Sequence, residues 1–228
     1  MAKAPKTAYV CNDCGAEFSR WQGQCSACKA WNTISEVRLI SASNSTKNDR
    51  FSGYAGETRA KIQTLSEISL QETPRFTSGF KELDRVLGGG IVPGSAILIG
   101  GHPGAGKSTL LLQVMCGLAK NMTALYVTGE ESLQQVAMRA NRLNLPTDKL
   151  NMLSETSVEQ ICNLADQLKP QIIVVDSIQV MHLSDIQSSP GSVAQVRECA
   201  SFLTRYAKTR QVAIIMVGHV TKDGTLAG

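Results

Sequence analysis

The sequence predicts an α/β protein whose core holds a mainly parallel sheet, preceded by a small four-cysteine module. Two observations lead to this prediction. From about residue 61 onward, short continuous apolar runs alternate with segments of helical periodicity, which is typical of a parallel sheet covered on both faces. Before that point, four of the seven cysteines lie within the first 28 residues. We therefore expect a metal-binding module at 1–40, a linker at 41–60 and an α/β core at 61–228.

Composition and charge exclude several classes of protein. The chain has 228 residues, 43% of them hydrophobic and 18% charged, which suits one medium globular domain and a small one. No apolar run approaches the roughly 20 residues that cross a bilayer, so we expect no contact with a membrane. The first residues carry charge but no apolar signal segment, which favours a reducing cytoplasm. The net charge of +4 permits an anionic partner without requiring one.

The first four cysteines have the spacing of a metal site, C-x2-C-x10-C-x2-C, formed by Cys11, Cys14, Cys25 and Cys28. Each C-x2-C pair lies on a tight turn and aims two sulfurs at one point. Two such turns form a tetrahedral all-sulfur site that suits Zn²⁺. All four ligands come from the protein, so the zinc is expected to be structural and to supply most of the folding energy of this zinc ribbon. Two disulfides or a redox C-x2-C are the alternatives, and a reducing compartment disfavours both.

The two tryptophans, Trp21 and Trp31, belong to the same segment. Beside Arg20, an exposed indole would stack on a nucleic-acid base or on a protein partner. The alternative is that the indoles cover the metal site, and we favour this for at least one of them. The region 41–60 is rich in Ser, Asn and Gly and lacks apolar periodicity, which is typical of a linker.

The core elements follow from apolar periodicity and from capping residues. Ser78 is expected to cap a first helix that ends at the glycines 88–90. Ser132 and Ser157 each precede a glutamine by three residues, the pattern of a capping box, and Pro170 ends the second of these helices. The remaining helices are expected at 107–120 and 193–207, and the strands at 96–99, 124–128, 172–175 and 212–217.

A glycine-rich stretch between the strand 96–99 and the helix from Lys107 matches G-x4-G-K-[ST]. Its backbone N–H groups would surround phosphate oxygens, with Lys107 reaching the β- and γ-phosphates and Ser108 holding Mg²⁺. A chance match at a glycine-rich turn is the alternative, which the strand before and the helix after disfavour. His102 lies within this loop, near the expected phosphates, and needs no chemical role of its own. The candidate nucleotide-binding residues are Gly101, His102, Pro103, Gly104, Ala105, Gly106, Lys107, Ser108 and Thr109.

Three further side chains follow predicted strands and are candidate catalytic groups with Lys107. Asp176 ends the run IIVVD and would hold the water shell of Mg²⁺, beside the strand that leads into the phosphate loop. Glu130 is favoured over Glu131 as the carboxylate that serves ATP hydrolysis, because Glu131 is explained by the dipole of the following helix. His219 would sense the γ-phosphate. A turn cap for Asp176 and a turn histidine for His219 are the alternatives.

The set of motifs resembles a known family. The zinc knuckles, GGHPGAGKST, YVTGEES, VVDSIQ and VGHVTKDG occur in one order, and the chain resembles the bacterial RadA (Sms) family of DNA repair proteins, relatives of RecA, from Met1 to Gly228. The resemblance implies a RecA-like P-loop ATPase core after the zinc ribbon. It also implies an ATP-driven motor, a helicase on single-stranded and branched DNA that processes recombination intermediates as a homo-hexameric ring, with ATP between subunits.

Carried over by position, the resemblance assigns roles to individual residues. Lys107, Ser108 and Asp176 would be the nucleotide and Mg²⁺ residues, and Glu130 would activate water. Arg139 would pack near the nucleotide base, and His219 would be the γ-phosphate sensor. The segments 184–192 and 221 onward would be two DNA-facing loops, the second carrying Lys222, for which a solvated surface lysine is the alternative.

Family members continue past this point with a K-N-R-F-G motif and a domain resembling part of Lon protease, whereas this chain ends at Gly228. We expect the sheet to lack its last strands and ATP binding to survive, while hydrolysis in a ring and DNA unwinding stay open for this chain. Two other functions also stay open. One is a RecA-like signalling ATPase, in which paired glutamates also occur, and the other is a zinc-dependent interaction module that only binds nucleotide. A recombinase or replication protein is a candidate partner.

Overall fold

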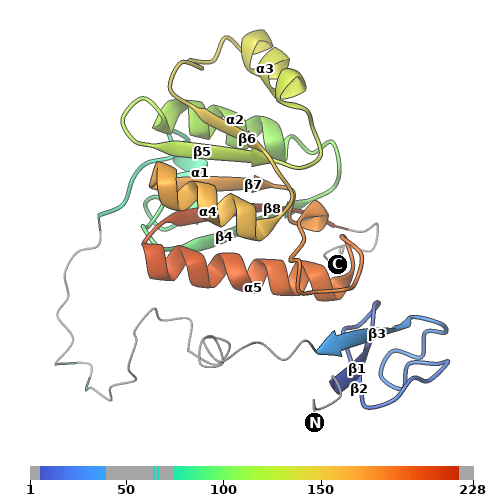
Figure 1. The fold of residues 1–228 in the computed structure, drawn as a ribbon. Helices are drawn as coiled ribbons and strands as arrows, with labels where there is room; N and C mark the ends of the chain where they lie inside the picture. Colours follow the sequence, from blue (N-terminus) through green and yellow to red (C-terminus); the bar gives the residue numbers. More distant parts are fainter. Residues whose placement is uncertain (1–5, 40–63, 65, 67–73, 221–228) are drawn as a thin grey trace.

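The structure is a computed structural model that describes residues 6–39, 64, 66 and 74–220 (Figure 1). The expected linker at 41–60 and the second DNA-facing loop, including Lys222, lie outside the described residues. No helix in the described ranges is both long enough and apolar enough to span a membrane.

The core is built on a parallel sheet, which confirms the predicted α/β fold (Figure 1). All neighbouring strands pair in parallel. In spatial order the strands are β4 (Ala96–Gly101), β8 (Ala213–His219), β7 (Ile172–Asp176), β5 (Ala124–Thr128) and β6 (Asn151–Ser154). Strand β6 escapes prediction because it is short, half polar and only partly buried at the sheet edge.

Helices cover both faces of this sheet, which explains why its central strands are continuous apolar runs. In β7, Ile172 and Val174 belong to one buried cluster, while Ile173 and Val175 belong to the other. The first cluster is covered by α1 (Lys81–Val86), α2 (Lys107–Leu118) and α3 (Leu133–Arg142). The second is covered by α4 (Val158–Leu168) and α5 (Val193–Arg210), which lie in front of the sheet in Figure 1.

Two expectations about strand placement are wrong. The strand that carries Asp176 does not lie beside the phosphate-loop strand, because β8 pairs with both β4 and β7 and separates them. Strand β4 is not buried either. It forms one edge of the described sheet, and the side chain of Leu98 in it is 47% exposed. Strand order depends on packing between distant segments, which an apolar run does not encode.

Serine caps account for three helix starts. Ser132 and Gln135 form the predicted reciprocal capping box of α3. Ser157 caps α4 by accepting from the Gln160 N–H, but its own N–H donates to Glu155 instead of completing a box. Ser192, which was not predicted, caps α5.

The predicted cap at Ser78 is wrong. Helix α1 begins at Lys81, and no side chain caps its start. The carboxylate of Asp84 instead accepts from the Ser78 N–H at 2.8 Å and from the Thr77 hydroxyl, so the helix supports the turn before it.

The N-terminal ribbon is a small antiparallel sheet in the order β2 (Glu17–Phe18), β1 (Lys6–Cys11) and β3 (Ile34–Leu39). Among the ribbon residues whose burial the structure describes, 9–35, the buried cluster contains Cys11, Cys25 and Ile34. So little buried apolar surface cannot stabilise a fold, and the ribbon depends on its metal site.

A buried glutamine on α5 holds the segment that follows the short helix η2 (Ile178–Val180). Gln195 is 2% exposed, and its amide nitrogen donates to the carbonyls of Ile186 and Ser188, each at 3.0 Å. Its amide oxygen accepts from the Leu183 N–H at 3.1 Å. On the α4 side, Glu159 accepts from the Ser184 N–H at 2.8 Å. The segment 184–192, expected to face DNA, is thus fixed by side chains of two helices.

Replacing Gln195 with Ala should lower the free energy of unfolding by about 2 kcal/mol, because the buried backbone groups it serves lose their partners. Hydrogen exchange should accelerate in peptides covering 183–191 and stay unchanged in β5 and β7. Urea denaturation gives the free energy, and exposed Gln134→Ala on α3 is the matched control. Equal stability of both variants would contradict this role.

Candidate active site and metal centre

The candidate catalytic side chains meet at the edge where the parallel strands end. Gly101 of β4 is in register with His219 of β8, and Thr128 of β5 with Asp176 of β7. In parallel α/β sheets, ligands bind outside these carboxyl ends. The sheet therefore brings together segments that are more than 100 residues apart in the sequence.

The phosphate loop has the backbone that an anion requires. Gly104 and Gly106 have φ of +79° and +85°, left-handed values that favour glycine. Helix α2 begins at Lys107 with Gly106 as its N-cap. No side chain caps its first turn, and no acidic residue lies there. Its first N–H groups and the positive end of its dipole are thus available to an anion, so a triphosphate fits this loop.

Lys107 carries a buried charge with no counter-ion. The residue is 8% exposed, and its ammonium donates to the carbonyls of Gly101 at 2.7 Å and His102 at 2.9 Å. Among the ion pairs of the described residues, none involves Lys107. A buried ammonium is costly without a negative partner, and a phosphate would supply one. The donor set therefore fits the phosphates of a nucleotide.

His219 connects the lysine to Glu130. Its Nδ1 lies 3.4 Å from the Lys107 ammonium nitrogen, and its Nε2 lies 3.2 Å from Oε1 of Glu130. One neutral tautomer, with the hydrogen on Nε2, satisfies both contacts. The same carboxylate accepts from the hydroxyl of Ser177, the residue after Asp176. This series of contacts depends on the position of β8 between β4 and β7, because that position puts His219 between the phosphate loop and the acidic residues.

Asp176 is held by a tyrosine that the sequence analysis missed. Its Oδ2 accepts from the Tyr126 hydroxyl at 2.6 Å, and the two residues are 8% and 1% exposed. Burial raises the pKa of Tyr126, and the charge of Asp176 raises it further, so the phenol stays a donor. A tyrosine inside an apolar strand has the pattern of a core residue, and only the strand pairing reveals its partner.

The two neighbouring glutamates have different partners. Glu131 is paired with Arg139 of α3, whose Nη2 contacts both carboxylate oxygens, one of them at 2.5 Å. Arg139, expected near a nucleotide base, is thus engaged beside the site, while its Nη1 is buried without a hydrogen-bond partner. Glu130 faces His219 and Ser177 instead. Glu130, and not Glu131, belongs to the group around the phosphate loop.

The residue before the two glutamates, Gly129, has no room for a side chain. A Cβ there would lie 2.5 Å from Val180 Cγ2 and 3.0 Å from Met181 Cε, closer than such contacts allow. The segment after β7 packs directly on the end of β5. This close approach brings Ser177 to Glu130.

Ser108 and Asp176 offer a hydroxyl and a carboxylate, the oxygen ligands that Mg²⁺ prefers. Ser108 lies in the first turn of α2 and is half-buried, and Asp176 ends β7. The donor types fit the metal.

The four cysteines of the ribbon converge as the spacing predicts. Their sulfurs all lie within 4.8 Å of one another, with Cys11 and Cys28 at 3.7 Å and Cys14 and Cys25 at 3.5 Å. A tetrahedral zinc site with Zn–S near 2.3 Å places sulfurs about 3.8 Å apart. All four cysteines are free, which excludes the disulfide alternative in this structure. The donor set fits zinc.

The two knuckles are built alike. In each, the first cysteine carbonyl accepts from the residue four positions on, Gly15 or Lys29, and those residues have left-handed φ of +72° and +64°. Burial opposes ionisation of Cys11, but hydrogen bonds, that of Thr33 foremost, outweigh it and lower its pKa to about 6. The pKa values of Cys14 and Cys28 are raised instead, because burial and the neighbouring sulfurs outweigh their backbone hydrogen bonds. A thiolate is the form that binds a metal.

Neither tryptophan covers the metal site, so that expectation is wrong. Trp21 is 58% and Trp31 68% exposed. Tyr9 and Phe18 pack against the buried cysteines instead.

Two family models match the chain. Residues 60–225 match an AAA domain, and residues 9–36 match a rubredoxin metal binding domain. The DNA repair protein RadA of Haemophilus influenzae is 94% identical over 228 residues, all of this chain and 50% of the relative. The chain belongs to the bacterial RadA family. RadA of Escherichia coli is 72% identical and RadA of Bacillus subtilis 45%, again over all of this chain and 50% and 49% of the relatives.

The chain thus spans about half the length of the curated RadA relatives it matches. Family membership covers the ribbon and the AAA domain. The activity, substrates and partners of a whole RadA protein are a matter for proposal here.

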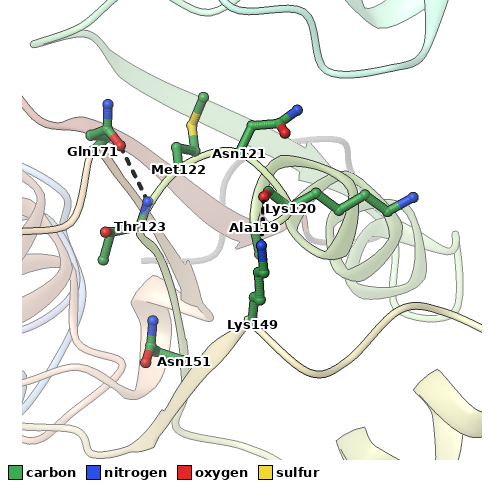
Figure 2. A pocket seen from close by; sticks show the side chains of 8 residues that line it. All are labelled: Ala119, Lys120, Asn121, Met122, Thr123, Lys149, Asn151 and Gln171. Atoms are coloured by element: carbon green, nitrogen blue, oxygen red, sulfur yellow. Dashed lines mark hydrogen bonds between the residues drawn. The ribbon is translucent and has the colours of Figure 1, made fainter.

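A hollow at the other end of the sheet does not belong to this site. Its residues precede or begin β5, β6 and β7, so it lies at the amino ends of the strands (Figure 2). Two hydrogen bonds join its lining residues: the Thr123 N–H donates to Gln171, and Lys149 donates to the Lys120 carbonyl (Figure 2). The lining residues are Ala119, Lys120, Asn121, Met122, Thr123, Lys149, Asn151 and Gln171.

Freshly reduced RadA-family chain should contain one zinc per molecule, and Cys25→Ser should abolish it because three thiolates and a hydroxyl bind zinc far more weakly. The backbone amides of β1 to β3 should then lose protection from hydrogen exchange while those of β5 and β7 keep theirs. Metal analysis provides the first readout. Cys162→Ala, in the α/β core, is the matched control and should retain the metal. Wild-type protein without zinc would exclude the site.

Proposed function

We propose that this chain is the zinc ribbon and ATP-hydrolysing core of a DNA-dependent motor of the RadA family. The motor would be a helicase that acts on single-stranded and branched DNA during repair and homologous recombination. The observation that carries the proposal is the buried, uncompensated charge of Lys107 at the start of an uncapped helix, with Glu130, Asp176 and His219 at the neighbouring strand ends. Such an arrangement suits a nucleoside triphosphate.

Binding would begin with exchange of partners at Lys107. Its ammonium leaves the carbonyls of Gly101 and His102 and pairs with β- and γ-phosphate oxygens, while the first N–H groups of α2 donate to the phosphate oxygens. Ser108 and Asp176 would hold Mg²⁺, which would supply positive charge against the phosphates when bound. Arg139 and Glu131 remain beside the site, close to where the resemblance places the nucleotide base.

Glu130 is the proposed base for the attacking water. Its side chain is 38% exposed, so water reaches it, and the Ser177 hydroxyl and His219 Nε2 fix its orientation. Glu130 accepts the proton of the water that attacks the γ-phosphorus, and ADP and phosphate are the products. His219 contacts both Lys107 and Glu130, so it would register whether a γ-phosphate is present.

The DNA part of the proposal rests on the relatives, which are named DNA repair proteins, and on the segment 184–192. Ring assembly as a homo-hexamer, a recombinase or replication partner, and a cytoplasmic location belong to the same proposal. A signalling ATPase would hydrolyse ATP without a response to DNA. A zinc-dependent interaction module would act without hydrolysis.

ATP hydrolysis measured with and without single-stranded DNA tests the proposal, both on this chain and in a full-length relative such as RadA of Escherichia coli. Stimulation by DNA is expected in the full-length protein. Lys107→Ala should abolish nucleotide binding. Glu130→Gln should keep binding and lower the hydrolysis rate at least about 100-fold, the usual contribution of a general base. Glu131→Gln is the control and should keep most of the rate.

Two results would count against the motor. One is a full-length protein that hydrolyses ATP at the same rate with and without DNA at low salt, which supports the signalling function. The other is unchanged repair function after Lys107→Ala, which supports the interaction module.

Tyr126→Phe should raise the Mg²⁺ concentration that half-saturates nucleotide binding by about 10-fold or more. The variant removes the hydrogen bond that orients Asp176, and one such bond to a charged group contributes on the order of 1.5 kcal/mol or more. Binding of a fluorescent ATP analogue over a Mg²⁺ titration measures the shift. Tyr206→Phe, at a tyrosine bonded to Asp166 far from the loop, is the control. A Mg²⁺ requirement equal to that of the wild type would exclude a positioning role for Tyr126.

A further inference from the structure

The chain contains two tryptophans, and both lie exposed on the zinc ribbon. Trp21 is 58% and Trp31 68% exposed, and neither packs against the buried cysteines. Indole is the largest side chain and is highly buried on average in folded proteins. Exposing two indoles to water on a module of about 35 residues is unfavourable in free energy, and no contact within the described ribbon offsets it.

The two indoles lie next to each other over Gly23. A Cβ built at Gly23 would be 3.7 Å from Cη2 of Trp21 and 3.8 Å from Cζ3 of Trp31, so these ring atoms are at most about 7.5 Å apart. Any larger residue at position 23 would lie against both rings. The glycine therefore leaves the space beside the indoles open.

The backbone under the indoles is fixed by the second zinc knuckle. The Gly23 carbonyl accepts from the Asn32 N–H at 2.8 Å, and Gln24 and Trp31 form an antiparallel bridge. The Gln24 side chain donates to the Lys29 carbonyl at 2.9 Å, inside the knuckle that begins at Cys25. The indoles therefore lie on a turn whose backbone is fixed by hydrogen bonds, so that less conformational entropy is lost when a ligand binds.

The charged residues closest to each indole in the sequence are both positive. The stretch 18–35 contains Arg20 and Lys29, both exposed, and no acidic residue. Acidic residues stand at both ends of this stretch, Glu17 in β2 and Glu36 in β3, and Asp13 belongs to the first knuckle. An anionic partner that also presents flat aromatic faces is a nucleic acid with unpaired bases.

We propose that Trp21, Gly23 and Trp31, with Arg20 and Lys29, form a tryptophan surface that binds single-stranded nucleic acid. Unpaired bases stack on the two indoles, and the adjacent phosphates pair with the two cations. The choice of a single strand as ligand rests on the proposed DNA function, but the surface lies outside the nucleotide site. Binding here needs zinc and does not need ATP.

Tryptophan emission tests this directly, because the ribbon holds every tryptophan of the chain. Addition of an oligo-dT 20-mer to the zinc-loaded chain at low salt, without nucleotide, should quench the emission. A duplex of the same length should quench far less, because its bases are already stacked. Anisotropy of a labelled 20-mer provides the affinity of each variant.

Trp21→Ala and Trp31→Ala should each weaken binding of the 20-mer about 10-fold, while Trp31→Phe should weaken it less because phenylalanine still stacks. Val86→Ala on α1 is the matched control, since Val86 is also 68% exposed and apolar. Replacing Arg20 and Lys29 together with Gln should lower the salt dependence of binding. Zinc content of every variant establishes that the ribbon is folded.

Unchanged emission on addition of single-stranded DNA, with zinc present, would overturn the proposal and leave a protein as the partner of this surface. Equal affinity of wild type, Trp21→Ala and Trp31→Ala would overturn it as well. Lys107→Ala should show the same quenching as the wild type. Quenching on this chain, together with no stimulation of ATP hydrolysis by DNA in the full-length relative, would refute the motor and support the tryptophan surface, so the two proposals fail separately.

Discussion

The ammonium of Lys107 lies in the mouth of the phosphate loop, where it contacts two carbonyl oxygens and an imidazole but no carboxylate. The other features of the site follow from this missing negative charge. The loop glycines turn the backbone N–H groups of the helix start toward the same space. Glu130 contacts His219, which in turn contacts Lys107, and its carboxylate accepts from the Ser177 hydroxyl. The site therefore attracts an anion without neutralising itself.

Local physics explains what could be predicted from the sequence. The zinc knuckles were predictable because ligand spacing within a turn determines where sulfurs point. Strands β5 and β7 were predictable because burial on both faces requires an unbroken apolar run. Strand β6 was not predictable, because an edge strand tolerates polar residues. Strand β4 was predicted as a strand, but its place at the sheet edge, which leaves Leu98 half uncovered, was not.

Non-local pairing explains what could not be predicted. Nothing in the run of residues 213–219 indicates that it lies between β4 and β7, yet that position places His219 against both Lys107 and Glu130. The role of Tyr126 as a donor to Asp176 depends on the same sheet order. Arg139 was assigned by resemblance to a nucleotide contact, and its pairing with Glu131 is visible only in three dimensions.

The nucleotide site and the segment 184–192 are connected by a short path of packed groups. Ser177, which bonds to Glu130, is followed directly by η2, and η2 packs on Gly129 through Val180. Gln179 of η2 donates to the His219 carbonyl at 3.4 Å. Gln195 and Glu159 fix the segment 184–192, so the backbone between it and the nucleotide site has little freedom to move. If Glu130 or His219 shifts on nucleotide binding, either η2 deforms or the segment that follows it moves. Deformation of η2 is disfavoured because Met181, directly after it, is fully buried and closely packed. The zinc ribbon has no part in this path, which is why its tryptophan surface and the nucleotide site can be tested one at a time.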